Sequence, residues 1–202
     1  MRKDIVVIGA SSGGIEALRI LAGQLPRDLA ASIFVVLHTA PDSPGYLASI
    51  LDRAGPLPAT CVEELARIEP GHIYVAAPDR HLLVEDGIAR ATRGPKENRF
   101  RPAIDPLFRS AAQAYGTRVI GVILTGALDD GTAGLSAVKQ LGGTAVVQDP
   151  VDALYPSMPR SALAGVRVDH CVPLVEIAPL IVQLTREPAD EKGAYKVPEQ
   201  IN

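Results

Sequence analysis

The sequence predicts an α/β domain with a doubly wound, mainly parallel sheet that is flanked by helices and accompanied by a small antiparallel hairpin region. Runs of β-branched residues alternate along the chain with segments that carry apolar residues at helical spacing, which is the pattern of α/β domains. The first three runs are almost continuously apolar, as in strands that helices cover on both faces. We expect strands at residues 5–8, 32–37, 119–124, 144–147 and 166–172.

Helices are predicted between these strands, because apolar residues recur there three or four positions apart. Another helix is expected to begin at Asp105 as its N-cap, with Pro106 at the first helical position, since proline at that position costs no hydrogen bond. The apolar stripes lie within residues 15–25, 135–141 and 177–184.

Three short apolar runs, separated by the turn signals Pro-Asp and Asp-Gly, interrupt this alternation at residues 72–76, 81–84 and 88–92. They predict an antiparallel hairpin or meander beside the main sheet. No linker divides the chain, so we expect one domain over residues 1–186 and a polar C-terminal tail over residues 187–202.

The composition excludes several classes of protein. With 20 Lys and Arg against 23 Asp and Glu, the 202-residue chain has a formal charge of −3, so bulk nucleic-acid binding is not expected. The longest stretch without a charged side chain, residues 29–41, is too short to cross a membrane. The two cysteines form neither a CxxC pair nor a zinc spacing. A cytoplasmic chain without membrane insertion and without a metal site is predicted.

Polar side chains follow three of the predicted strands. Ser11 comes after the first strand, His38 after the second and Asp130 after the strand at residues 119–124. Ligands of open parallel sheets bind outside the carboxyl ends of the strands. The sequence therefore predicts an active site where these three residues meet.

The glycine-rich residues 9–14 allow several interpretations. A dinucleotide site requires a glycine where Ser11 stands and an acid where His38 ends the second strand, and a P-loop requires Gly-Lys-Ser/Thr; the segment has neither. A nucleophile elbow fits, because the segment matches G-x-S-x-G between a strand and a helix. On the loop alone, a nucleophile and a turn whose serines cap the helix are equally supported.

His38 favours the nucleophile, although a lone histidine is more often structural, because it ends a predicted buried strand beside Ser11. Asp129 or Asp130 could orient the imidazole as the third member of a triad, or simply cap the helix that follows. The chain order Ser, His, Asp differs from the Ser, Asp, His order of the α/β-hydrolases and disfavours an ordinary lipase or esterase. The remaining histidines are predicted to be structural: His72, His81 and His170.

Seven short motifs resemble the catalytic domain of CheB-type chemotaxis methylesterases and occur in the same order as in that family. They extend from the first strand to about residue 184 and cover nearly the whole chain. The motifs are residues 8–14, 70–76, 78–81, 98–102, 124–126, 130–131 and 158–160.

The resemblance implies a protein-glutamate methylesterase that hydrolyses glutamate γ-methyl esters on chemoreceptor helices and also deamidates glutamine. It implies that Ser11 is the nucleophile, His38 the base and Asp130 the orienting carboxylate. Neither a cofactor nor a metal is implied. Backbone N–H groups near the nucleophile would hold the oxyanion, namely those of Ser12, Gly13, Gly14 and Ala127.

Two arginines of the family-like segments, Arg101 and Arg160, are expected to line the cleft and to meet an acidic receptor helix, although loop arginines are most often solvated. Residues 125–131 read Thr-Gly-Ala-Leu-Asp-Asp-Gly, where the family usually has Thr-Gly-Met-Gly-Asn-Asp-Gly. A change in substrate preference is expected if the methionine side chain shapes the family's pocket.

Family members usually carry an N-terminal receiver domain, for which the four residues before the first strand leave no room. The chain is therefore expected to be either a stand-alone homologue or a fragment, and its start, Met-Arg-Lys, favours the stand-alone homologue. Its partners would be methylated chemoreceptor cytoplasmic helices and, for control, separate response regulators or other chemotaxis signalling proteins. Two alternatives stay open: a serine hydrolase or deamidase that acts on another signalling protein, and a non-catalytic homologue that binds receptors.

Overall fold

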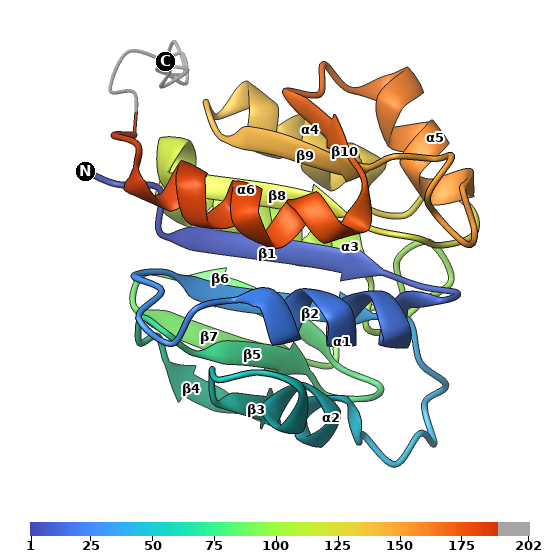
Figure 1. The fold of residues 1–202 in the computed structure, drawn as a ribbon. Coiled ribbons are helices and arrows are strands. Elements are labelled where there is room, and N and C mark those ends of the chain that lie inside the picture. The colour runs from blue at the N-terminus through green and yellow to red at the C-terminus, as the bar shows by residue number, and fades with distance from the viewer. Residues whose placement is uncertain (190–202) are drawn as a thin grey trace, which may run out of the picture.

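A seven-stranded parallel sheet forms the centre of the molecule in the computed structural model, which describes residues 1–189 (Figure 1). The strand order is β10-β9-β8-β1-β2-β5-β3, so the chain leaves β1 toward one edge and returns to build the other half from β8. The predicted α/β class is confirmed. The strands are β1 (Ile5–Ala10), β2 (Ser32–Leu37), β3 (Ala59–Val62), β5 (Ile73–Ala76), β8 (Val119–Ile123), β9 (Thr144–Gln148) and β10 (His170–Val172).

Helices cover both faces of this sheet, because its central strands carry apolar side chains on both faces. In β1, Val6 and Ile8 face one core, while Ile5 and Val7 face the other. The first core is closed by α1 (Gly14–Gln24), α2 (Leu47–Ala54) and α6 (Leu174–Arg186). The second core is closed by α3 (Ile104–Tyr115), α4 (Thr132–Gln140) and α5 (Ser157–Gly165), and a 3-10 turn, Gly116–Arg118, follows α3.

A second, three-stranded antiparallel sheet packs against α3. It consists of β4 (Leu65–Arg67), β7 (Ile88–Thr92) and β6 (His81–Glu85), in that order. The β6–β7 hairpin was predicted, with Asp-Gly at its turn. The prediction for residues 72–76 was wrong, because β5 pairs in parallel with β2 and β3 inside the main sheet.

Three further local predictions need correction. Residues 166–172 form a strand only at their end, in β10, because α5 extends to Gly165. Ile15, the first residue of the predicted stripe, is 51% exposed. Asp105 is not the N-cap of α3, since that position belongs to Ala103 and the Asp105 carboxylate bonds elsewhere.

The beginning of the predicted tail returns to the N-terminus. Ala189 donates its N–H to the Met1 carbonyl at 2.8 Å, and Pro188 pairs with Arg2; the rest of that predicted tail, residues 190–202, lies outside the described part of the chain. Within residues 1–189, no helix is both long enough and apolar enough to cross a membrane.

The contact between α1 and α2 yields a test of the fold. A Cβ at Gly55 would overlap the carbonyl oxygen of Ala22, a backbone atom that can move only if the chain around it shifts. We expect Gly55→Ala to lower the free energy of unfolding by about 1–3 kcal/mol through overpacking, as measured by urea denaturation. Gly94→Ala is the matched control, because its Cβ would meet only His81 Cδ2 at 3.7 Å. Equal stability of the two variants would contradict this packing.

Candidate active site

The ends of two neighbouring strands place the predicted nucleophile beside the predicted base. Ala10 at the end of β1 is paired with Leu37 at the end of β2, so Ser11 and His38 leave the sheet side by side. The ladder continues for one more bond, because His38 N–H donates to the Ala10 carbonyl at 3.2 Å. Asp130 arrives from the loop after β8, which pairs with the other side of β1.

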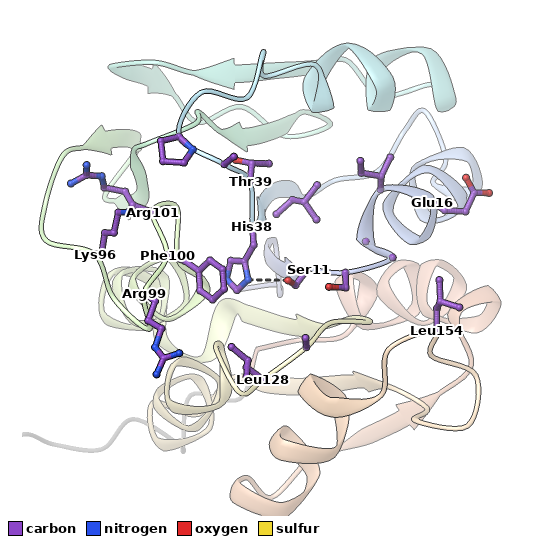
Figure 2. A pocket seen from close by; sticks show the side chains of 18 residues that line it. Ser11, Glu16, His38, Thr39, Lys96, Arg99, Phe100, Arg101, Leu128 and Leu154 are labelled. Atoms are coloured by element: carbon purple, nitrogen blue, oxygen red, sulfur yellow. Dashed lines mark hydrogen bonds between the residues drawn. The ribbon is translucent and has the colours of Figure 1, made fainter.

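Ser11, His38 and Asp130 form one hydrogen-bonded chain. His38 Nδ1 lies 3.0 Å from Ser11 Oγ (Figure 2). His38 Nε2 lies 2.7 Å from Asp130 Oδ2. The imidazole tautomer with its proton on Nε2 fits this arrangement, because it donates to the carboxylate and leaves the Nδ1 lone pair to accept the serine O–H. The side chains of His38 and Asp130 are only 4% and 1% exposed.

Asp130 is held by the beginning of α3 as well as by His38. Its Oδ2 accepts the N–H of Ile104 at 2.7 Å, and its Oδ1 accepts the N–H of Asp105 at 3.2 Å and the Asn98 amide at 2.7 Å. Burial alone would raise the pKa of this carboxyl, but the hydrogen bonds from His38, Ile104 and Asn98 outweigh it and hold the pKa below its ordinary value. Asp129, the other predicted candidate, is exposed.

An aromatic ring that the sequence analysis did not single out covers the imidazole. Phe100 stacks on His38 with ring centroids 3.7 Å apart and an angle of 3° between the planes (Figure 2). A parallel aromatic neighbour restricts the rotation of the imidazole. Its sequence signal was only its place within one family-like motif, because no periodic pattern connects residue 100 to residue 38.

The loop after β1 turns sharply at Gly13, whose φ is +76°. Ser11 itself does not have a positive φ, so the strained serine of a nucleophile elbow is not present. The Gly14 N–H donates to the Ser11 carbonyl at 2.8 Å, which removes it from the predicted oxyanion donors. No acceptor within residues 1–189 takes the N–H groups of Ser12, Gly13 or Ala127, so these three donors remain available.

Thr125, which follows β8, ties this loop to its neighbours. Its carbonyl accepts the Ser11 N–H at 3.1 Å, and its Oγ1 donates to the Ser12 carbonyl at 3.1 Å. The same Oγ1 accepts the Tyr155 N–H at 2.8 Å. Three loops at the carboxyl edge of the sheet are therefore joined beside the nucleophile.

Ser11 and His38 open into a cleft of about 870 Å³. Its lining includes the exposed apolar side chains of Ile15, Leu128 and Leu154 and the acidic side chain of Glu16. The cationic side chains of Lys96 and Arg99 line it near Phe100, away from Glu16 (Figure 2). The cleft can therefore accept a segment that has both apolar and acidic side chains.

The two arginines predicted to face a partner differ in position. Arg101 lines the cleft, but its guanidinium donates to Asp79 Oδ1 at 2.6 and 2.9 Å and to the Gly94 carbonyl at 2.8 Å. The Arg101 hydrogen bond holds the pKa of the Asp79 carboxyl below its ordinary value. Arg160 is exposed on α5 and is not among the residues that line the cleft.

A profile of the CheB methylesterase family matches residues 6–181 of this chain. The chain belongs to this family. The family resemblance drawn from the sequence motifs is thereby confirmed.

Within residues 1–189, the structure does not group three His, Cys, Asp or Glu side chains in a way that would hold a metal ion.

Individual relatives agree with the family assignment. A protein of Leptospira interrogans, provisionally named as a protein-glutamate methylesterase/protein-glutamine glutaminase, is 39% identical over 193 residues, 95% of this chain and 100% of that protein. Protein-glutamate methylesterase/protein-glutamine glutaminase 2 of Anaeromyxobacter dehalogenans is 38% identical over 92% of this chain and 54% of its own length. The crystal structure of the Thermotoga maritima CheB methylesterase catalytic domain superposes with a TM-score of 0.86 at 34% identity, over 91% of this chain and 100% of that one.

The lowered pKa of Asp130 predicts a pH-dependent contribution to stability. Because the folded state binds fewer protons than the unfolded state, this contribution is complete above about pH 5 and declines as the pH falls through the folded-state pKa. We expect Asp130→Asn to reduce the free energy of unfolding more at pH 7 than at about pH 3.5, as measured by urea denaturation. Asp129→Asn, a change to the exposed neighbour, is the control and should have little effect at either pH. An Asp130→Asn effect that is the same at both pH values would contradict the prediction.

Proposed function

We propose that this chain is a protein-glutamate methylesterase that hydrolyses the γ-methyl esters of glutamate side chains on chemoreceptors and releases methanol. The observation that carries the proposal is the hydrogen-bonded chain of Ser11, His38 and Asp130 at the cleft of a CheB-family fold. The site then works in the cytoplasm, on the cytoplasmic helices of the receptor.

The geometry supports a serine acyl-transfer mechanism. His38 Nδ1 takes the Ser11 proton while Oγ attacks the ester carbonyl, and Asp130 stabilises the imidazolium that forms. The available N–H groups of Ser12, Gly13 and Ala127 are the candidate donors to the oxyanion.

Collapse of the tetrahedral intermediate breaks the bond to the methoxy group, which leaves as methanol with the proton from His38. Water then attacks the glutamyl-serine ester, with His38 again acting as base, and frees a glutamate carboxylate and Ser11. Deamidation of glutamine follows the same steps with ammonia as the leaving group, which agrees with the second activity in the relatives' names.

The loop after β8 distinguishes this site from the usual family motif. Ala127 stands where that motif has methionine, and the exposed Leu128 takes a positive φ of 66° where the motif has glycine. A leucine at this position adds apolar surface to the cleft. We propose that the substrate segment contacts both Leu128 and Lys96, which line the cleft.

Removal of the nucleophile tests the proposed activity. We expect Ser11→Ala to lower methanol release from methylated receptor membranes by about 10⁴-fold or more. Ser136→Ala, a change on α4 away from the cleft, is the matched control and should retain full activity. Equal release by the wild type and Ser11→Ala would remove Ser11 from the mechanism. No release by the wild type, on membranes that a known methylesterase demethylates, would contradict the substrate assignment.

The cationic side chains that line the cleft, Lys96 and Arg99, yield a second test. If an acidic receptor segment binds there, Lys96→Glu should lower kcat/KM by about fivefold, the upper range for an exposed charge pair, and the loss should shrink at high salt. Arg27→Glu is the charge-matched control, because Arg27 is exposed and precedes β2. It therefore lies toward the amino ends of the strands, whereas the cleft lies at their carboxyl ends. Equal effects of the two reversals at all salt concentrations would exclude a specific contact at Lys96.

A further inference from the structure

A tight turn over residues 97–100 lies directly against the triad. Glu97 and Phe100 exchange both backbone hydrogen bonds, at 3.1 and 2.8 Å, and the two residues between them have positive φ values, 50° at Asn98 and 71° at Arg99. Two central residues with positive φ are the mark of a type I′ turn, in which asparagine is favoured at the first of the two positions. The turn therefore fixes where the Asn98 side chain points.

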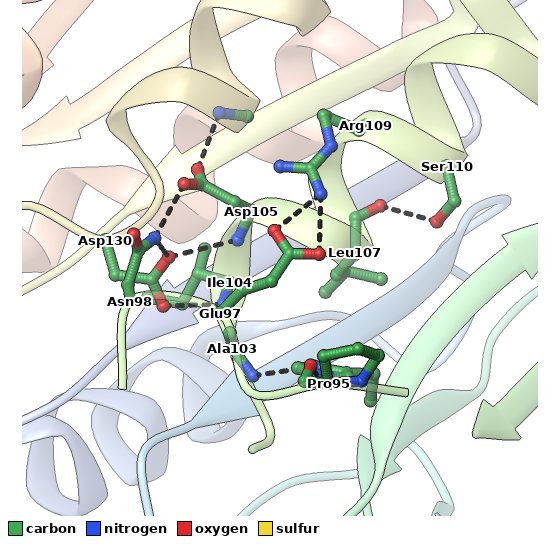
Figure 3. A network of polar contacts seen from close by, with 12 residues as sticks. Pro95, Glu97, Asn98, Ala103, Ile104, Asp105, Leu107, Arg109, Ser110 and Asp130 are labelled. Carbon is green, nitrogen blue, oxygen red and sulfur yellow. Dashed lines mark hydrogen bonds and ion pairs between the residues drawn. The ribbon is translucent and has the colours of Figure 1, made fainter. Parts of the chain in front are cut away.

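The Asn98 amide bridges two buried carboxylates. Its Nδ2 donates to Asp130 Oδ1 at 2.7 Å and to Asp105 Oδ2 at 2.8 Å (Figure 3). An amide nitrogen has two protons, and both are used here. Asp130 and Asp105 are only 2% and 5% exposed, although Asn98 itself lies at the surface.

The turn is anchored at both ends. Glu97 accepts two hydrogen bonds from Arg109 Nη2 on α3, at 2.6 and 2.9 Å (Figure 3). At the other end, Phe100 stacks on His38. The same four residues thus contact two members of the triad, the carboxylate through Asn98 and the imidazole through Phe100.

We propose that Asn98 is a positioning residue for the reaction: its amide holds the Asp130 carboxylate in line with the His38 ring by tying it to Asp105. This inference rests on the proposed function of the triad. Without the amide, Asp130 Oδ1 keeps only the longer 3.2 Å hydrogen bond from Asp105 N–H. Oδ2 is still held by the Ile104 N–H, but the weaker restraint on Oδ1 lets the carboxylate rotate about its Cβ–Cγ bond. Its alignment with His38 Nε2, and with it the orientation of the imidazole toward Ser11, becomes less exact.

The electrostatics of the pair point the same way. Burial raises the pKa of the Asp105 carboxyl, and the charge of Asp130 raises it further, while hydrogen bonds from Gly134 and Asn98 oppose the rise. A neutral donor between two buried acids favours the ionised form of both. With the Asn98 amide between them, the Asp105 carboxyl can lie beside Asp130 while Asp130 stays ionised.

Two substitutions separate positioning from a merely structural role in the turn. Glycine and aspartate both tolerate a positive φ, so a structural role predicts that Asn98→Gly and Asn98→Asp keep full activity. Positioning predicts that Asn98→Gly lowers kcat for methanol release by about 10- to 100-fold, the range for a lost hydrogen bond to a charged group, with KM unchanged. Asn98→Asp should lose more, because it adds a third negative charge and removes both donors.

A second readout does not depend on the receptor. Ethyl p-nitrophenyl methylphosphonate reacts with an activated serine: an Oγ–P bond forms, the bond to p-nitrophenolate breaks, and the serine proton passes to His38. The rate of p-nitrophenolate release should fall about 10- to 100-fold in Asn98→Gly. Asp86→Gly is the matched control, because Asp86 is an exposed residue of the β6–β7 turn and does not line the cleft. All variants are assayed well below their unfolding midpoints.

The two readouts distinguish this inference from the proposed function. A lower phosphonate rate in Asn98→Gly and Asn98→Asp, together with no methanol release by the wild type, would support the positioning role and reject the substrate. Rates within about twofold of the wild type for both variants would overturn the positioning role and leave the methylesterase proposal intact. A wild type inert in both assays would overturn both.

Discussion

The structure of this active site depends on the need to satisfy one buried carboxylate. Asp130 is 2% exposed, and an ionised group in that position is tolerated only if donors surround it. The donors come from His38, from the Asn98 amide and from the first two N–H groups of α3. Each donor fixes the position of its own segment, so the loop after β2, the turn at 97–100 and α3 are all aligned by the same carboxylate.

A second carboxylate repeats this interaction in the opposite direction. Asp130 precedes α4 and accepts the N-terminal N–H groups of α3, whereas Asp105 belongs to α3 and accepts the Gly134 N–H of α4 at 2.6 Å. Each helix thus receives a negative charge at its N-terminus from the segment of the other, which offsets the helix dipole and satisfies free N–H groups. The close approach requires a glycine, because a Cβ at Gly134 would lie 2.6 Å from Phe108 Cβ.

The sequence predicted that Ser11, His38 and Asp130 meet, but not which groups hold them in place. Ser11, His38 and Asp130 follow strands, and the carboxyl ends of parallel strands meet at one edge, so their proximity could be inferred without coordinates. Asn98, Phe100 and the role of Asp105 follow from no such rule, since a turn contacts a residue 32 positions away through its own backbone conformation. The position of Asp105 before Pro106 suggested an N-cap, and nothing else was needed to explain this aspartate locally. That interpretation was wrong, because the Asp105 carboxylate accepts the Gly134 N–H of α4 instead of capping its own helix. The same limit applies to β5, whose apolar run is compatible with either sheet until its partners are known.

The carboxylates that orient His38 and the apolar and cationic side chains of the cleft surface are therefore different sets, the first buried and the second exposed. The charges that orient the imidazole are buried and paired, and no buried side-chain nitrogen or oxygen within residues 1–189 lacks a hydrogen-bond partner. The cleft surface, by contrast, is built from exposed side chains such as Leu128 and Lys96, whose replacement breaks no internal bond. Residues 127 and 128 differ from the usual family motif without disturbing Asp130, only two positions further on, because the donors that hold Asp130 come from His38, Asn98 and α3 and not from its own loop. The surface that the proposed substrate meets can consequently change within the loop after β8 while the hydrogen bonds that join Ser11, His38 and Asp130 stay the same.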